Sequence, residues 1–209
     1  MNVVFATVLF LAAVPHPLDF AEHRRPYTEV KQALVRYLGA ERWASLKATP
    51  PLAFNLRQRW IGEDQEGFVS KGHARTKKTY LYTPRERRPY EITIGMDGLL
   101  YGADRKPFGT GAHETLLVED AASGKLYALE LASNRFVHAS FNAGAPTTIS
   151  AEVKVKDGRV RKFKNRSGHY RMDRLSFMRA MDDLEAHGLD LSSASVEFDH
   201  QSLLEPEHD

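Results

Sequence analysis

Apolar and polar residues alternate along much of the second half of the chain, as they do in strands that bury one face. Within residues 147–156 an apolar side chain occupies every second position from Ile149 onward. Asp157-Gly158 follows as a strong signal for a tight hairpin turn, and Val160 continues the pattern on the returning segment. This stretch predicts a β-hairpin.

Shorter alternating stretches predict further strands. They are residues 90–94, 99–101, 113–118, 125–131 and 189–198, with weaker short strands between residues 52 and 82. Residues 136–141 alternate as well, which would place His138 and Ser140 on one face of a strand. The segment of residues 142–146, which contains Gly and Pro, should then bend the chain.

Two segments instead show the spacing of amphipathic helices. Tyr27, Val30 and Leu34 lie on one face of the first, which Gly39 should end. The second helix is expected at residues 173–187, and its apolar face holds Leu175, Met178, Met181 and Leu184. The sequence therefore predicts an α+β fold, in which an N-terminal and a C-terminal helix pack on a curved antiparallel β-sheet of six or more short strands.

The length of 209 residues fits one domain with an N-terminal appendage. We expect residues 1–50 to hold an apolar segment and the first helix, residues 51–200 to form a single α+β domain, and residues 201–209 to be a flexible acidic tail. The apolar run of residues 3–14 is too short to span a membrane and has no basic residue before it. A buried segment is slightly favoured over an export signal. Because the chain has no cysteine, both the cytoplasm and export from a bacterial cell stay open as its location.

Three short motifs resemble a known family. They are HxSFxAG at residues 138–144, SGHY at residues 167–170 and ERxxYE at residues 86–91. Together they resemble the C-terminal domain of the plant IQM proteins, which are calmodulin-binding proteins named for an IQ motif, and similar bacterial domains of toxin or effector type. The resemblance spans residues 81–191. No IQ motif occurs in this sequence, so the resemblance does not imply calmodulin as a partner.

Charge is unevenly distributed, although the formal net charge is only +2. Residues 71–88 and 154–174 are basic, whereas residues 182–209 contain nine acids and no Lys or Arg. A solvated surface explains any single run, but two basic runs flank the motif region. We therefore expect an anionic small molecule or an acidic protein as the partner. A nucleic acid is not expected, because the usual recognition motifs are missing.

Two functional hypotheses from different classes follow. The first is a group-transfer enzyme similar to an ADP-ribosyltransferase, which would act on an anionic, nucleotide-like ligand with NAD as the candidate cofactor. Its catalytic residues would be His138, Tyr170 and Glu197, with Glu152 as an alternative acid. The second hypothesis is a non-catalytic protein-binding or adaptor module that uses the same loop face.

Ligand contacts are expected from the two motif loops and the basic segments. The candidate residues are Arg87, Ser140, Gly144, Arg166, Ser167 and His169. His138 and His169 should line one cleft if they share a site. The structural alternatives are a His138 that only bonds its neighbours and a Tyr170 that anchors the core. A metal site is not expected, because the histidines show no ligand spacing and the chain has no cysteine. The sequence also has no GxSxG elbow of a serine hydrolase.

Overall fold

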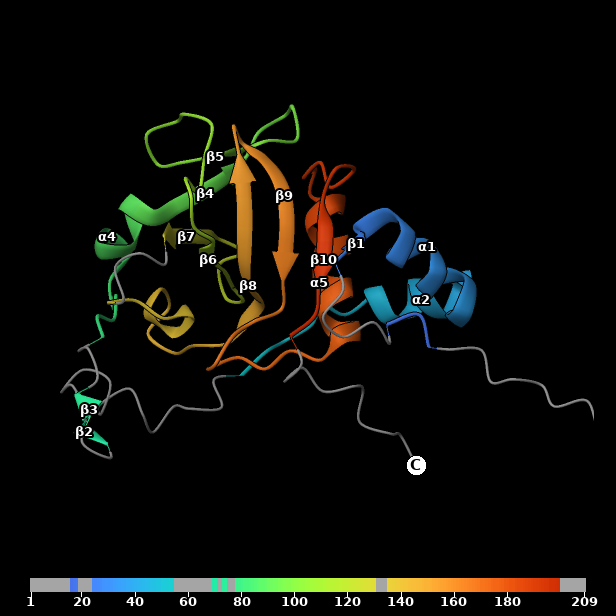
Figure 1. Cartoon of the computed structure of the whole chain (residues 1–209), viewed down its shortest axis with the longest axis horizontal. Helices are drawn as coiled ribbons and strands as arrows, with labels where there is room; N and C mark the ends of the chain where they lie inside the picture. Colours follow the sequence, from blue (N-terminus) through green and yellow to red (C-terminus); the bar gives the residue numbers. More distant parts are fainter. Residues whose placement is uncertain are drawn as a thin grey trace, which may run out of the picture.

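The computed structural model describes residues 16–18, 24–54, 69–70, 73–74, 78–130 and 135–199. Its centre is an eight-stranded sheet in the order β1-β10-β9-β8-β6-β7-β4-β5 (Figure 1). The apolar run of residues 3–14 and the tail at residues 201–209 lie outside the described residues.

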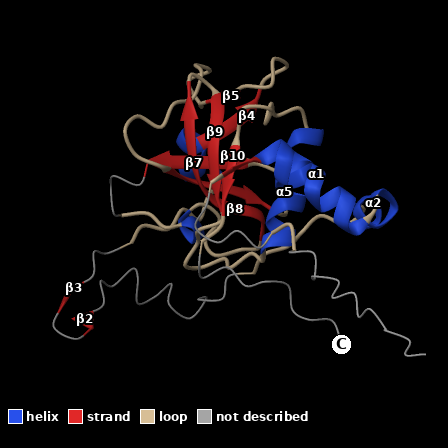
Figure 2. Cartoon of the chain, turned by 45° about the vertical axis from the view of Figure 1, so that its right-hand side comes forward, coloured by secondary structure: helices blue, strands red, loops and turns tan. Residues whose placement is uncertain are grey.

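The strands of the main sheet are short at its ends and longest at its centre, where β8 and β9 lie (Figure 2). They are β1 (Arg25–Pro26), β4 (Glu91–Ile94), β5 (Leu100–Tyr101), β6 (Thr115–Asp120), β7 (Leu126–Glu130), β8 (Thr147–Lys156), β9 (Arg159–Lys164) and β10 (Ser195–Glu197). A separate pair joins β2 (Val69–Ser70) to β3 (His73–Ala74) within the expected region of weak strands. The helices are α1 (Tyr27–Leu38), α2 (Ala40–Lys47), α4 (Pro84–Arg87) and α5 (Arg174–Ala186), with 3₁₀ turns η1 (Arg88–Tyr90) and η3 (His138–Ser140).

The sheet is mixed, because β10 runs parallel to β9 while the other described pairs in it are antiparallel. Helix α5 lies between β9 and β10 in the chain and makes the crossover that a parallel pair requires. The α+β class is confirmed, and the expectation of a purely antiparallel sheet holds everywhere except at this pair.

The β8–β9 hairpin forms as the sequence predicts. Asp157 and Gly158 both adopt positive φ angles, of 51° and 76°, as the two central residues of a type I′ turn do. The Gly158 carbonyl accepts a hydrogen bond from the Leu100 N–H at 2.8 Å. A Cβ at Gly158 would lie 3.0 Å from the Leu100 carbonyl oxygen, so the turn also needs glycine for its close approach to β5.

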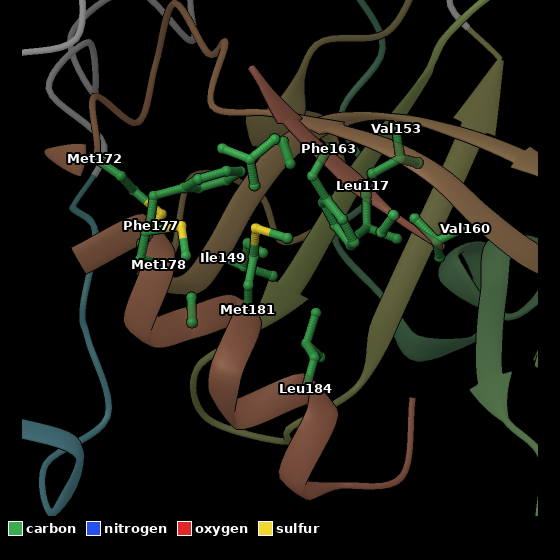
Figure 3. Packing of buried hydrophobic residues seen from close by; sticks show 14 of the residues in the cluster. Leu117, Ile149, Val153, Val160, Phe163, Met172, Phe177, Met178, Met181 and Leu184 are labelled. Carbon is green, nitrogen blue, oxygen red and sulfur yellow. The ribbon is translucent and has the colours of Figure 1, made fainter. Parts of the chain in front are cut away.

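Helix α5 covers one face of the sheet and forms the main core. Asp173 caps its N-terminus by accepting a hydrogen bond from the Ser176 N–H at 2.7 Å. Gly188 ends the helix with a φ of 98°, as expected for a glycine at the C-terminus. The apolar side of α5 packs onto β6, β8 and β9 (Figure 3) through Phe177, Met178, Met181 and Leu184, which meet Leu117, Ile149, Val153 and Phe163.

The opposite face of the sheet is divided into an apolar and a polar part. Leu116 and Val118 of β6 point to this face and pack with Tyr127, Leu81 and Phe141 in a second cluster. Glu152 of β8 lies opposite Leu116 in the sheet, so its side chain points to the same face. Helices α1 and α2 lie at the other end of the sheet from α4 and β4, beside α5 and β10.

The predicted strand at residues 136–141 is wrong, because residues 138–140 form the turn η3. The Ser140 hydroxyl accepts a hydrogen bond from the Val137 N–H at 2.9 Å, and the Ser140 N–H donates to the Val137 carbonyl, also at 2.9 Å. These local bonds compete with a strand ladder. Ala143 and Gly144 then take positive φ angles and reverse the chain toward β8.

Within the part of the chain that the structure describes, none of the helices is both long enough and apolar enough to cross a bilayer.

Candidate functional site

The HxSFxAG residues form a buried turn beside the central strands. His138 is 5% exposed, and its Nε2 donates a hydrogen bond to the Ala151 carbonyl of β8 at 2.8 Å. Because a carbonyl only accepts, this bond places the ring proton on Nε2. Burial is the main cause that lowers the pKa of His138 to about 4; the bond to Ala151 opposes the shift, and the neighbouring His169 adds to it. His138 is therefore neutral at physiological pH.

The SGHY residues form a second loop, which is bonded to the first. The Tyr170 hydroxyl lies 2.9 Å from the Asn142 Oδ1 and 2.7 Å from the Ala145 carbonyl oxygen, and both atoms accept from it. The Asn142 Nδ2 also donates to Ala145, at 2.7 Å. Ser167 holds the loop by accepting from the Tyr170 N–H at 3.1 Å. Tyr170 is fully buried and burial raises its pKa, so it is an anchor between the two loops.

The structure brings His138 and His169 together. The charge of His169 is close enough to lower the pKa of His138. Both side chains are more than nine-tenths buried, with exposures of 5% and 6%. Both histidines thus lie in the packed interior, and they do not line an open cleft.

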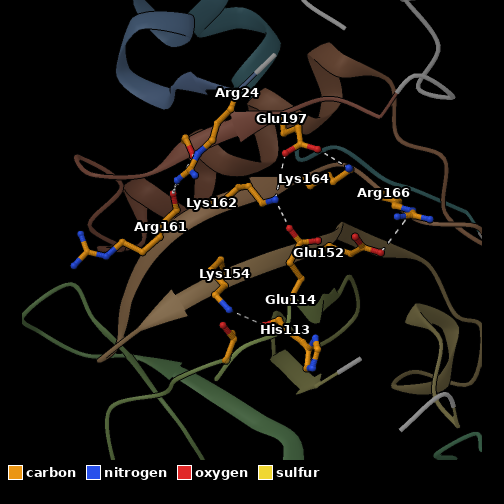
Figure 4. A network of polar contacts seen from close by, with 12 residues as sticks. Arg24, His113, Glu114, Glu152, Lys154, Arg161, Lys162, Lys164, Arg166 and Glu197 are labelled. Atoms are coloured by element: carbon orange, nitrogen blue, oxygen red, sulfur yellow. Dashed lines mark hydrogen bonds and ion pairs between the residues drawn. The ribbon is translucent and has the colours of Figure 1, made fainter. Parts of the chain in front are cut away.

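A network of charged side chains covers the polar part of the sheet face next to the loops (Figure 4). Glu197 of β10 is held by two lysines of β9, with its carboxylate 3.2 Å from the Lys162 Nζ and 2.5 Å from the Lys164 Nζ. Burial alone would raise the pKa of Glu197, but these two lysines hold it below its usual value. Lys162 also forms an ion pair with Glu114, which precedes β6. This network joins β6, β9 and β10.

Glu152 of β8 is the carboxylic acid of the network whose pKa is raised. Burial raises its pKa to about 7, and the hydrogen bond with Glu114 raises it as well. Arg166 opposes this shift from a distance of 3.8 Å between its Nε and the Glu152 Oε1. For Glu114, burial is outweighed by the contact with Lys162, so its pKa is lowered. The two carboxyl groups therefore share one proton near neutral pH.

The remaining candidate residues surround the same loops. Ser140 shapes η3 through its bond with Val137, and Gly144 provides the positive φ angle of the turn. Arg166 is the exposed one, with 60% of its side chain accessible. Arg87 donates to the carbonyls of Leu81 and Tyr82, at 3.1 and 3.2 Å, and thereby holds the segment that precedes α4.

Sequence reasoning missed Asn142 and Glu114. Asn142 follows Phe141 in the first motif loop and accepts the Tyr170 hydroxyl. Its position in a predicted bend could have indicated this role, because Asn side chains in bends often form hydrogen bonds with the backbone. Glu114 reaches Glu152 because β6 pairs with β8 in a register that sets Leu116 opposite Glu152. A local pattern carries no information on that register.

With this geometry in view, comparison with known proteins gives a consistent result. Residues 86–177 match the family model of the IQ motif-containing protein middle domain. The chain resembles the IQM proteins. This IQM-like chain is 31% identical to the IQ domain-containing protein IQM5 of Arabidopsis thaliana over 133 residues, which are 61% of the chain and 26% of the plant protein. It thus spans about a quarter of the length of that relative.

The resemblance expected from the motifs is confirmed, with the difference that the matched model is of the middle domain and not of the C-terminal domain. No solved structure gives a significant match. The names of the matched family and relative include no transferase, toxin or bacterial effector.

Proposed function

We propose that this IQM-like domain is a non-catalytic protein-binding module. The observation that carries the proposal is that the residues suited to chemistry are bonded within the domain. The Tyr170 hydroxyl is bound by Asn142 and Ala145, the His138 Nε2 by a strand carbonyl, and the Glu197 carboxylate by two lysines.

The protonation states of these groups also favour a structural role. A general acid or base works best with a pKa near the operating pH. Burial raises the pKa of Tyr170 and lowers that of His138 to about 4, so both move away from neutrality. Their bonds instead connect the two motif loops to each other and to β8. In this proposal the motif residues stabilise the fold, and other residues on the surface of the domain bind the partner.

The similarity to IQM proteins supports a role in protein interaction, and the partner is a separate question. The curated relative is named for its IQ domain, whereas this sequence contains no IQ motif. Calmodulin is therefore not the partner proposed. The two basic segments of the sequence instead favour an acidic protein partner.

The proposal is tested by comparing binding and turnover in the whole chain and in Tyr170→Phe. An enzyme that uses the hydroxyl would lose turnover in this variant, whereas a binding module would lose stability only. We expect a loss of about 1–3 kcal/mol, because the buried Asn142 Oδ1 loses its donor, whereas the Ala145 carbonyl keeps the bond from the Asn142 Nδ2. Urea unfolding measures that loss, and affinity capture with quantitative proteomics measures binding at a temperature at which both forms are folded.

We expect the same proteins to be captured by the wild type and by Tyr170→Phe. We also expect no consumption of NAD and no rise in melting temperature with NAD, ATP or ADP-ribose, although a ligand at a hundred times its Kd would stabilise the fold by about 2.7 kcal/mol. The proposal is wrong if the wild type consumes NAD and a folded Tyr170→Phe does not. Calmodulin serves as a defined comparison protein in the capture experiment.

A further inference from the structure

Residues 81–90 form a largely exposed segment, here called the ridge, that is fixed by its own hydrogen bonds. Thr83 and Glu86 make a capping box at the start of α4, in which the Glu86 N–H donates to the Thr83 hydroxyl at 3.3 Å and the Glu86 carboxylate accepts from the Thr83 N–H at 2.8 Å. The same carboxylate accepts from the Tyr82 N–H at 3.0 Å. Pro84 in the first turn of α4 restricts the backbone further.

The ridge is also attached to the body of the domain. The Leu81 N–H donates to the Ser140 carbonyl at 2.8 Å, which joins the start of the ridge to η3. Arg87 turns back to the carbonyls of Leu81 and Tyr82. At its far end the ridge passes directly into β4 of the sheet, through η1. The backbone that presents the ridge side chains is therefore set before any partner arrives.

Arg85 and Arg88 point outward from this fixed backbone. They are three residues apart, which places them on neighbouring positions of one helical face. Both are exposed, and neither has a carboxylate partner among the residues that the structure describes. Some other surface cations of the described chain are paired: Lys125 binds Glu91 at 2.9 Å and Arg159 binds Asp190. Tyr82 lies beside the two arginines in the chain and is 55% exposed.

We propose that Tyr82, Arg85 and Arg88 form a docking surface for an acidic segment of a protein partner. The proposal rests on the proposed function and names the place and the chemistry of binding. A guanidinium group binds a carboxylate with two parallel hydrogen bonds, and Tyr and Arg are the residues most enriched at the centres of interfaces. Because the ridge is preorganised, little conformational freedom is lost when the segment binds.

A nucleic acid fits this surface less well. Binding to a phosphate backbone draws on many cations spread along a face. The ridge offers two arginines without a carboxylate partner among the described residues, and the carboxylate of Glu86 on the same ridge is taken up by the backbone and hydroxyl of Thr83. So small a number of cations suits a short run of Asp and Glu side chains better than a phosphate backbone.

The test is selection from a displayed library of random peptides against the whole chain, followed by affinity measurement of the selected peptides. We compare the wild type with Arg85→Glu/Arg88→Glu and with the neutral Arg85→Gln/Arg88→Gln. The matched control is Arg36→Glu/Arg42→Glu, which makes the same change of charge on exposed positions of α1 and α2, at the other end of the sheet. All four proteins should melt at similar temperatures, because the altered side chains are exposed and none of them makes the capping bonds of α4.

We expect the selected peptides to be rich in Asp and Glu. Their affinity should fall roughly 30-fold in the Glu variant, as two exposed ion pairs become repulsive, and less in the Gln variant. The control should stay within about twofold of the wild type, and added salt should weaken wild-type binding.

Several results would overturn the inference and leave the protein-binding function standing. They are selected peptides without acidic residues, acidic peptides that bind the Glu variant as well as the wild type, or a wild type that self-associates through the ridge in light scattering. Binding of a single-stranded RNA through Arg85 and Arg88, with no acidic peptide selected, would also overturn it. If neither peptides nor proteins bind the chain at all, the proposed function fails together with the ridge.

Discussion

The variant Glu152→Gln should change how the stability of the domain depends on pH. Burial and Glu114 raise the pKa of Glu152 in the folded state from 4.5 to about 7. In the unfolded chain the carboxyl ionises near its usual value. Between these two pH values the folded state binds more protons than the unfolded state, so the free energy of unfolding falls as the pH rises. A glutamine stays neutral and still donates to Glu114, and it therefore removes this loss.

The magnitude follows from the size of the shift. A rise from 4.5 to about 7 corresponds to roughly 3 kcal/mol at 1.36 kcal/mol per pH unit. This figure is an upper bound, because Glu152 and Glu114 titrate as a pair. We therefore expect Glu152→Gln to be about 2 kcal/mol more stable than the wild type at pH 8 and equal to it, within about 0.5 kcal/mol, at pH 4.5.

Urea unfolding between pH 4.5 and pH 8, followed by circular dichroism, measures the difference. The matched control is Glu114→Gln. The Lys162 contact outweighs burial and lowers the pKa of Glu114, so its ionised form adds stability above the usual pKa, and that stability is lost as the pH falls. This control should be less stable than the wild type at pH 8. Parallel stability curves for the wild type and Glu152→Gln would refute the reasoning, because they would mean that Glu152 titrates normally.

Three further substitutions test the core and the turns by urea unfolding. Leu184→Ala should lower the free energy of unfolding by about 3 kcal/mol, since the side chain is 1% exposed, and a loss below about 1 kcal/mol would contradict this packing. Asp182→Asn should lower it by about 1 kcal/mol, because Lys31 and Lys47 would lose the carboxylate that pairs with both but are themselves partly solvated; an unchanged stability would show that the pairs contribute nothing. Gly158→Ala should lower it by about 1–3 kcal/mol, because the residue has a positive φ angle and lies close to the backbone of Leu100. The control Gly124→Ala also has a positive φ angle but open space around it, so it should lose less stability. Equal losses would exclude the close contact as a cause.

The elements that sequence reasoning predicts well are those whose causes are local. The β8–β9 hairpin follows from strict alternation and from Asp157-Gly158, which favour positive φ angles without help from the rest of the chain. Helix α5 follows from its apolar period and from Asp173 and Gly188 at its ends. In each case the information lies within a few neighbouring residues.

The elements that sequence reasoning misses depend on competing local hydrogen bonds or on contacts between distant parts of the chain. Six alternating residues at 136–141 fit a strand, but the Ser140 hydroxyl binds the backbone locally and favours a turn. The parallel pairing of β10 depends on where α5 returns the chain, which the alternation in residues 189–198 does not encode.

The candidate site divides in the same way. The proximity of His138 and His169 could be expected, because one motif precedes β8 and the other follows β9, and the start and end of a hairpin lie side by side. The pairing of Glu114 with Glu152 could not, because it requires the register of β6 against β8. The burial of Tyr170 was one of two interpretations that the sequence left open, and only its bonds to Asn142 and Ala145 distinguish them.

A motif that recurs within a family can mark a joint of the fold as well as a reactive site. In this domain polar atoms of the HxSFxAG and SGHY loops form hydrogen bonds with each other and with β8. These bonds connect residues that are distant in the sequence. The ERxxYE motif contains both residues that hold the fold and a residue that is free to bind a partner. Glu86 and Arg87 bind the backbone around them, whereas Arg88 and its neighbour Arg85 face solvent. Recognition is best sought at side chains that the fold positions and does not use, and the described surface offers such a pair on this ridge.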